Sequence, residues 1–233
     1  MKKNPNIEVE LCGIKFRNPV LTAAGPPVRN GEAILRCADG GAGGIVTKTI
    51  STKKAKPPLP CMAEIRGGFI NTELWSELSP NRWLKKEYKI AKSCGLPLII
   101  SIGYSSEQIS NLAPKVAKYA DGLELSTHYI EPKDMVETIK TAKEIFSPVF
   151  VKFSPNITDI ALFAKYAENA GADGIVAINS FGPCLSIDIE NKMVMMGGTG
   201  YGWLSGQAIR PIALRFVYEI AKNVKIPVIG VGG

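Results

Sequence analysis

The chain lacks several features that would assign it to common functional classes. Its 233 residues include one histidine, and no apolar run approaches the roughly 18 residues that span a bilayer. The first ten residues, MKKNPNIEVE, carry two lysines but no apolar segment, so we expect no signal peptide and no membrane association. No GxGxxG motif follows the first apolar run, which disfavours a Rossmann domain.

The cysteines are few and scattered. There are five of them, Cys12, Cys37, Cys61, Cys94 and Cys184, and no two form a CxxC pair. This spacing disfavours an iron–sulfur cluster, a structural zinc site and a disulfide framework, so we expect no bound metal. Free cysteines are typical of a reducing compartment, which predicts a cytoplasmic location.

The overall composition is that of an ordinary globular protein. Hydrophobic residues make up 45% and charged residues 21%, so the chain can bury a large core and is not disordered. For this length we expect a single domain over residues 1–233. The 28 basic and 21 acidic residues give a net charge of +7. Much of the excess lies on amphipathic segments such as RWLKKEYKIAK, so we interpret it as a solvated face and expect no nucleic-acid partner.

Short β-branched runs alternate with amphipathic stretches along the whole chain. Each run is almost continuously apolar, as expected of parallel strands that are covered on both faces. The runs are 20–25, 44–51, 97–104, 122–127, 148–155, 174–180 and 227–233. Most begin about 25 residues after the previous one, the length of one strand plus one helix. Seven such units favour an α/β protein with the (β/α)8 TIM barrel architecture.

The predicted barrel departs from eight equal units. The opening segment IEVELCGIKFRNP alternates around Cys12 and Gly13, which predicts an N-terminal β-hairpin that plugs the barrel. The sequence ends at Gly233, directly after the seventh run, so we expect a barrel truncated after strand 7, with its last βα unit absent. Two connections, 52–80 and 181–207, are unusually long. Loops at the carboxyl ends of barrel strands build the active site, so we expect these two to cover the substrate.

Polar and small residues end the predicted strands where the site is expected. They are Ala24, Gly25, Lys48, Thr49, Ser126, Thr127, His128, Lys152, Asn179, Ser180, Gly232 and Gly233. A lysine within a parallel strand is costly unless it is paired or contacts a ligand. Lys48 and Lys152 therefore either face an anionic or electron-rich ligand, which we favour, or form buried ion pairs. Glu73 and Glu124 are the candidate partners for such pairs.

The segment GYGWLSGQAIRP, residues 200–211, combines glycines with a predicted helix start. Backbone N–H groups at such a turn can hold a phosphate, and Ser205 and Gly206 lie at this turn. Gly232 and Gly233 offer a second glycine turn, and phosphates in these barrels often lie near the last two strands. A phosphate site and a simple tight loop are equally compatible with these glycines.

Longer motifs resemble one family of flavin barrels. The matching segments are NPVLTAAG, VTKTIS, FINTELWSE, VKFSPNITDI, AGADGIVAINS, GYGWLSGQAIRPIALR and IPVIGVGG. With them the chain resembles the FMN-dependent dihydroorotate dehydrogenases and, more closely, the pyrimidine-reducing domain of dihydropyrimidine dehydrogenase. The resemblance implies FMN as the cofactor. It also implies hydride transfer between the flavin and the C=C or CH–CH bond of a small pyrimidine-like ring.

The resemblance further implies roles for individual residues. Those that would bind FMN are Ala24, Gly25, Lys48, Thr49, Lys152, Ser205, Gly206, Gly232 and Gly233. Those that would bind the substrate ring are Asn71, Glu73, Ser126, Asn179 and Ser180. Lys48 would also act in catalysis, because a lysine beside the pyrimidine-like part of the flavin stabilises the anionic reduced form. Glu73 can accept a hydrogen bond from a ring N–H, which suits a neutral uracil-like ring better than orotate.

The segment after the fourth run departs from the family pattern. Where the family has a substrate-binding asparagine and then a proton-shuttling cysteine, this chain has Ser126 and Tyr129. Loss of a general acid or base costs about 10²- to 10⁴-fold in rate. His128 or Tyr129 could replace the lost acid, since histidine changes its charge near neutral pH. The alternative is that His128 only fills a shortened loop.

Other function classes stay open on the sequence. A partner-dependent or non-catalytic flavin subunit fits, because the chain has no cysteine set for an electron-transfer cluster of its own. A tRNA-dihydrouridine-synthase-like enzyme is a fold neighbour. An aldolase or synthase would need Lys48 or Lys152 as a Schiff-base nucleophile. As partners we expect a small pyrimidine-like substrate, a flavin or iron–sulfur electron-transfer subunit and a second copy of the chain in a homo-oligomer.

Overall fold

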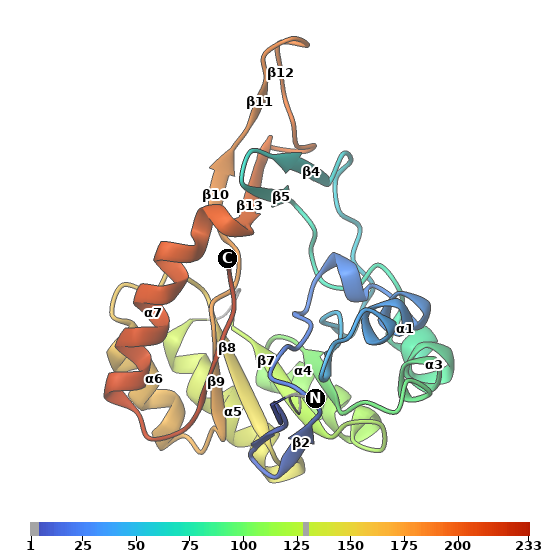
Figure 1. Ribbon diagram of the computed structural model, residues 1–233, viewed down its shortest axis with the longest axis vertical. Coiled ribbons are helices and arrows are strands. Elements are labelled where there is room, and N and C mark those ends of the chain that lie inside the picture. The colour runs from blue at the N-terminus through green and yellow to red at the C-terminus, as the bar shows by residue number, and fades with distance from the viewer. Residues whose placement is uncertain (1–4, 128–130) are drawn as a thin grey trace.

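The structure, a computed structural model that describes residues 5–127 and 131–233, is built around a sheet of parallel strands (Figure 1). The strands run in the order β14-β9-β8-β7-β6-β3. Their bounds are β3 Ile45–Val46, β6 Leu98–Ile102, β7 Gly122–Ser126, β8 Val149–Phe153, β9 Gly174–Ala177 and β14 Val228–Gly230. Neighbours in this sheet follow one another along the chain, which is the order of a barrel and not of a doubly wound sheet. The predicted α/β barrel is confirmed.

The first predicted strand, 20–25, is reduced to a single bridge, so the prediction of a full strand there was wrong. Leu21 pairs with Gly44 in the parallel sense, which places this segment beside β3. Thr22 explains the short pairing, because its hydroxyl donates to the Val46 carbonyl at 2.9 Å and accepts from the Val46 N–H at 2.8 Å. A side chain thus replaces ladder bonds. Within the described residues β14 pairs only with β9, so the sheet is open on its other side.

Helices connect the strands and lie on the outside of the sheet (Figure 1). They are α1 Gly31–Asp39, α3 Tyr88–Lys92, α4 Ser106–Val116, α5 Pro132–Ile145, α6 Ile160–Asn169 and α7 Arg210–Asn223. Shorter turns are η1 Pro26–Val28, α2 Pro80–Arg82, the π-helix η2 Trp83–Glu87 and η3 Gln207–Ile209. Asn30, Ser105 and Asp159 cap α1, α4 and α6 by accepting a backbone N–H bond. No helix in the described part of the chain is long and apolar enough to cross a membrane.

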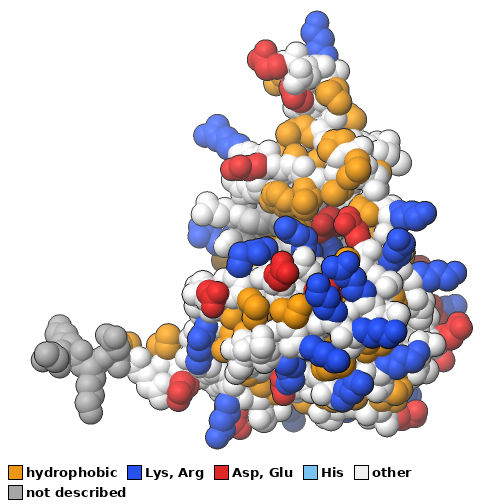
Figure 2. Space-filling model, turned by 90° about the vertical axis from the view of Figure 1, so that its right-hand side faces the viewer, with side chains coloured by type: hydrophobic (Ala, Val, Ile, Leu, Met, Phe, Trp, Pro, Cys, Tyr) orange, Lys and Arg blue, Asp and Glu red, His pale blue; other side chains and the backbone are white. Residues whose placement is uncertain are grey.

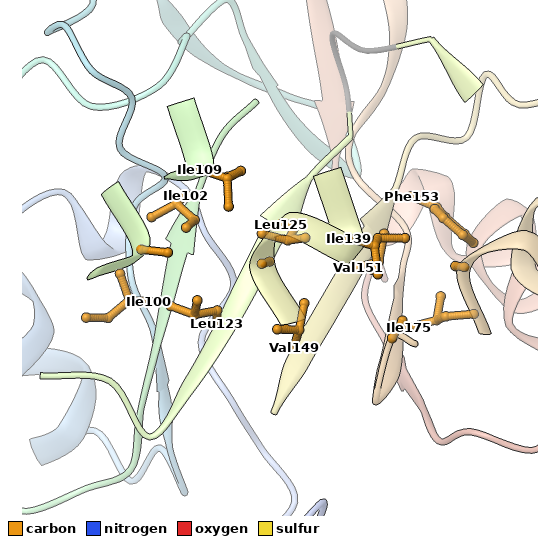
Figure 3. Packing of buried hydrophobic residues seen from close by; sticks show 14 of the residues in the cluster. Ile100, Ile102, Ile109, Leu123, Leu125, Ile139, Val149, Val151, Phe153 and Ile175 are labelled. Atoms are coloured by element: carbon orange, nitrogen blue, oxygen red, sulfur yellow. The ribbon is translucent and has the colours of Figure 1, made fainter. Parts of the chain in front are cut away.

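The outer side of the sheet forms the main core with the helices. Successive strand residues point to opposite faces, and Leu123, Leu125, Val149 and Val151 all face the helices. These four side chains are at most 1% exposed and share one cluster with Ile139 of α5 (Figure 3). This packing accounts for one half of each continuous apolar run in the sequence.

The inner side of the sheet forms a smaller cluster, which the N-terminal hairpin closes. Strands β1 Val9–Leu11 and β2 Ile14–Phe16 pair in the antiparallel sense. Ile14 and Phe16 are buried and belong to the same cluster as Phe150 of β8. The predicted hairpin plug is confirmed. It fills the barrel at the amino ends of the strands and leaves the carboxyl ends for polar side chains.

The two long connections meet above the carboxyl ends of the strands, as predicted (Figure 1). They form an antiparallel sheet in the order β10-β13-β5-β4. Its strands are β4 Met62–Ile65, β5 Gly68–Asn71, β10 Phe181–Leu185 and β13 Tyr201–Ser205. β13 joins the two connections by pairing Trp203 with Asn71 and Ser205 with Phe69. A further hairpin, β11 Ile187–Asp188 and β12 Met193–Val194, projects beyond this cover.

Candidate active site

A cavity of about 290 Å³ lies between the parallel sheet and the antiparallel cover. Its volume is close to the lower limit for small-molecule and cofactor sites. The predicted site residues that line it are Ala24, Gly25, Lys48, Thr49, Asn71, Glu73, Ser126, Lys152, Asn179, Ser180, Ser205 and Gly232. Segments that are far apart in the sequence therefore meet around one space.

Two of the described site residues do not belong to this lining, and two further predicted residues are not described by the structure. Gly206 and Gly233 are chain neighbours of lining residues but do not border the cavity themselves. His128 and Tyr129 lie outside the described residues, so the roles assigned to them stay predictions.

The cavity also has aromatic walls that the sequence analysis missed. Tyr104 and Trp203 both line it, and Tyr104 makes an edge-on ring contact with Trp75 at 5.8 Å between centroids. Tyr104 is the last residue of the third apolar run, so the rule applied to the other strand ends would have found it. Trp203 had a weaker signal, because it lies within the glycine-rich segment that was interpreted as a phosphate turn.

Lys48 is held by an ion pair. Its Nζ lies 2.6 Å from Oε2 of Glu73, and the two side chains are 7% and 10% exposed. The Glu73 backbone N–H donates in turn to Oδ1 of Asn71 at 3.2 Å, which fixes the carboxylate on the cover. Lys48 thus forms the buried ion pair with Glu73 that was one of the two alternatives, and its contact with a ligand stays a prediction. Lys48 borders the cavity as one half of a neutral pair.

Lys152 differs from Lys48 because none of the described residues forms a hydrogen bond or ion pair with its ammonium group. The residue is 4% exposed, and its Nζ makes no hydrogen bond or ion pair with any described residue. Glu124, the other candidate partner, does not pair with it. Burial of an ammonium group without a partner is energetically costly. Lys152 is therefore the residue of this cavity whose charge an anionic or electron-rich ligand would stabilise most.

Amide and hydroxyl groups stand on both sides of the cavity. Asn179 accepts the Ser180 N–H through Oδ1 at 2.9 Å, which orients its side chain and leaves its NH₂ group for a ligand. Asn71 is held between the strands of the cover, since its Nδ2 donates to the Trp203 carbonyl at 3.3 Å. Such fixed donors and acceptors can recognise the carbonyl and N–H edges of a planar ring.

Two glycine turns lie at or beside the edge of the cavity, where the sequence predicted a phosphate site. Gly206 and Gly232 have φ values of +94° and +114°, which favour glycine. A Cβ atom at Gly206 would lie 3.0 Å from Cα of Gly68. In the turn that Gly206 begins, the Ala208 N–H donates to the Gly67 carbonyl at 2.8 Å and the Ile209 N–H donates to the Gly206 carbonyl at 3.2 Å. A phosphate here would therefore depend on the remaining N–H groups of the turn. A phosphate at this turn and a polar ring near Lys152 together match the two ends of FMN, so the residues present fit that cofactor.

Cys61 is not a nucleophile of this site. The residue is buried and does not line the cavity. Burial raises the pKa of the Cys61 thiol, and the carboxylates of Glu73 and Glu77 raise it further. A thiol in such surroundings stays protonated and unreactive near neutral pH.

Comparison with known proteins identifies the family. The family model of dihydroorotate dehydrogenase matches residues 6–233. The catalytic subunit of dihydroorotate dehydrogenase B (NAD(+)) from Methanothermobacter thermautotrophicus is 35% identical, over 97% of this chain and 79% of the relative. The corresponding protein of Caldicellulosiruptor bescii is 37% identical, over 98% of this chain and 80% of the relative. The chain belongs to the dihydroorotate dehydrogenase family.

A solved structure supports the fold of this family member. The putative lactate oxidase of Pediococcus acidilactici superposes with a TM-score of 0.51 at 15% identity, over 97% of this chain and 59% of that one. At this identity the likeness supports the barrel architecture only. As a dihydroorotate dehydrogenase family member, the chain is an oxidoreductase, as the motifs predicted. The closer similarity to dihydropyrimidine dehydrogenase stays a prediction.

Proposed function

We propose that the chain binds FMN in the cavity and transfers a hydride between the flavin and the CH–CH bond of dihydroorotate or a closely related pyrimidine. The observation that carries this proposal is Lys152, a buried lysine in the wall of the cavity that has no partner among the described residues, in a chain of the dihydroorotate dehydrogenase family. The positive φ values of Gly206 and Gly232 are compatible with a phosphate-binding turn for the same cofactor.

Different residues of the chain would contact the phosphate and the ring of the cofactor. When bound, FMN supplies the two-electron acceptor and donor for the hydride. The turn at Ser205 and Gly206 would hold the phosphate through backbone N–H groups. Lys152 would place a positive charge beside the ring, where it stabilises the negative charge that reduction adds. Because the ammonium group is already buried, little solvent must rearrange during the reaction.

The substrate would lie among the amide and hydroxyl groups of the cover and the strand ends. Asn71, Asn179, Ser126 and Ser180 would hydrogen-bond its ring, and all four border the cavity. Glu73, paired with Lys48, would accept from a ring N–H. The pair carries no net charge, so it suits a neutral part of the ring. The proton that accompanies the hydride is assigned to His128 or Tyr129 as a prediction from the sequence.

An anaerobic reduction experiment tests this function. Wild-type protein loaded with FMN is mixed with dihydroorotate or with dihydrouracil, and the flavin absorbance near roughly 450 nm is followed. We expect at least one of the two to bleach the flavin, and Asn179→Ala to slow the bleaching by about tenfold or more, because one bond to the ring is lost. If dithionite bleaches the flavin but neither pyrimidine does, the proposed reaction is wrong.

An electron-transfer partner follows from the same proposal. The relatives carry the words "catalytic subunit" in their names, which implies at least one other subunit. We propose that a separate flavin or iron–sulfur subunit reoxidises or reduces the flavin of this chain. Copurification from the native source followed by measurement of iron and flavin content tests this. A cytoplasmic location is proposed with it, on the basis of the free cysteines.

We also propose that two copies of the chain associate through the projecting hairpin. Ile187, Ile189 and Met193 of this hairpin are 57%, 81% and 54% exposed. Figure 2 shows hydrophobic side chains on the projecting part of the molecule and many Lys and Arg side chains on the broad face below it. An isolated two-stranded hairpin is marginally stable in water, so a covering partner is expected. Sedimentation of wild type and Ile189→Ser tests this; equal monomer fractions in both would contradict it.

A further inference from the structure

Glu124 is a buried carboxyl group that the proposed reaction does not use. The residue is 1% exposed and lies on β7. Its side chain makes no hydrogen bond or ion pair with any described residue, and Oε1 is shielded from water. A carboxyl group is almost never buried without a partner. Within the described residues, Glu124 therefore needs a physical explanation.

The strand register places Glu124 just below the floor of the cavity. On the neighbouring strands Ser101 of β6 and Phe150 of β8 lie opposite Glu124. One step nearer the cavity, Ser126 lies opposite Lys152. Glu124 borders a small void of about 10 Å³, large enough for about one water molecule. This void shares Ala23 and Val231 with the main cavity, so only a thin layer separates the two.

The charges inside the barrel balance only if Glu124 is included. Among the described residues, the charged ones that border the main cavity are Lys48, Glu73 and Lys152, and the one that borders the void is Glu124. Lys48 and Glu73 neutralise each other at 2.6 Å. Lys152 and Glu124 are the pair left over. From strand spacing and rise, their Cα atoms are about 8 Å apart, a distance over which opposite charges attract in a poorly solvated interior.

We propose that Glu124 is a positioning residue that supplies the counter-charge for Lys152. Its carboxylate attracts the Lys152 ammonium and holds it in place while no anionic ligand occupies the cavity. The absence of a direct bond leaves the ammonium free to turn toward a ligand. The inference concerns the FMN-free protein, and it extends the proposed function by explaining how the cavity holds Lys152, which has no direct partner among the described residues.

Acylation of the two lysines tests the pairing directly. FMN-free protein is treated with acetic anhydride, which reacts only with the uncharged amine, and modification of each lysine is followed by peptide mass spectrometry. In Glu124→Gln we expect Lys152 to react at least tenfold faster than in wild type, with the rate at Lys48 unchanged. In the matched control Glu73→Gln, Lys48 should react faster and Lys152 should not. Equal rates at Lys152 in wild type and Glu124→Gln would overturn the proposal.

Two further variants separate this role from a purely structural one. Glu124→Asp keeps the carboxylate and should keep the slow acylation of Lys152. The double variant Glu124→Gln/Lys152→Met should have a higher denaturation midpoint than Glu124→Gln alone, because no uncompensated charge stays buried. If the double variant has no higher denaturation midpoint than Glu124→Gln, the proposal is overturned. If Glu124→Gln does not fold, the double variant should still fold, and failure of both to fold overturns the proposal. Neither measurement uses FMN or activity, so a chain that fails as a pyrimidine dehydrogenase could still show the coupling.

Discussion

Lys48 and Lys152 occupy similar positions at the ends of predicted strands, but they differ in their charge partners. Both lie near the carboxyl end of a parallel strand, and they are 6% and 4% exposed. Lys48 has a carboxylate at 2.6 Å, whereas Lys152 has no partner among the described residues. A buried charge that is already compensated adds to the scaffold and positions its partner. A buried charge without a direct partner favours binding of a ligand, because the ligand can compensate that charge.

Two buried carboxyl groups show the same contrast. Glu87 of η2 is 2% exposed and accepts from the Gly31 N–H at 2.8 Å and from Nε of Arg82 at 2.9 Å. Burial by itself would raise the pKa of Glu87, but these donors outweigh it and lower the pKa. Glu87 thereby ties η2 to the first residue of α1. Among the described residues Glu124 has no such donors, and its place beneath the cavity is the basis for the proposed role toward Lys152.

The largest expected effect comes from removing the unpaired lysine. In FMN-loaded protein, Lys152→Met should slow flavin reduction by dihydroorotate by about 100-fold, because a preorganised charge beside the ring is lost. Lys48→Met is the matched control and should slow it by about tenfold, since Lys48 acts within a neutral pair. Rapid-mixing absorbance measurements give both rates. If Lys48→Met is the slower of the two variants, the assignment of the two lysines is reversed.

The next effect is on stability and concerns the paired lysine. Glu73→Gln leaves the Lys48 ammonium buried without a counter-charge, so the free energy of unfolding should fall by about 3 kcal/mol. Denaturant unfolding monitored by tryptophan fluorescence measures it. The double variant Glu73→Gln/Lys48→Met should recover part of this loss. A loss of under about 0.5 kcal/mol in the single variant would mean that the ion pair contributes nothing to the scaffold.

A smaller, pH-dependent effect is expected at Glu87. Its folded-state pKa is lowered, so its stabilisation is fully present above the unfolded-state pKa of about 4.3 and is lost as the pH falls through the folded-state value. Relative to Glu87→Gln, wild type should be more stable by about 2 kcal/mol at neutral pH. Unfolding curves between about pH 7 and pH 3 should show this difference shrinking only at the acidic end. A constant difference over the whole range would refute the assignment.

The smallest effect is expected at an exposed ion pair. In α7, Nε of Arg215 lies 3.0 Å from Oε1 of Glu219, and the two side chains are 64% and 35% exposed. Arg215→Ala should change the free energy of unfolding by less than about 0.5 kcal/mol. The same denaturant assay provides the baseline for Glu73→Gln. A loss as large as that of Glu73→Gln would show that burial does not distinguish the two pairs.

Sequence reasoning found the strands and the polar residues at their ends because both depend on local pattern. Continuous apolar runs predicted β6, β7, β8, β9 and β14, and the alternation around Cys12 predicted the hairpin that closes the barrel. The segment 20–25 is also apolar, but the Thr22 hydroxyl forms hydrogen bonds with the N–H and C=O groups of Val46. The apolar pattern alone does not predict that a side chain replaces these strand hydrogen bonds.

Partners of buried charges were harder to predict than their positions. Glu73 and Glu124 were both candidate partners, and in the described part of the chain only Glu73 forms an ion pair. The difference depends on how the cover folds back over the barrel, because Glu73 follows β5 and reaches Lys48 from above. Cover strands β5 and β13 come from connections about 130 residues apart, and their pairing leaves no periodic signal. The aromatic wall at Trp203 was missed for the same reason.

A titration of FMN-free protein with FMN tests the central claim, that the unpaired lysine marks a flavin site. Binding is followed by flavin fluorescence in wild type, Lys152→Met and Lys48→Met. The account predicts saturation at about one FMN per chain, with Lys152→Met weakening the affinity by about tenfold or more and Lys48→Met having a smaller effect. Absence of saturable binding in wild type, or equal affinity in wild type and Lys152→Met, would contradict it.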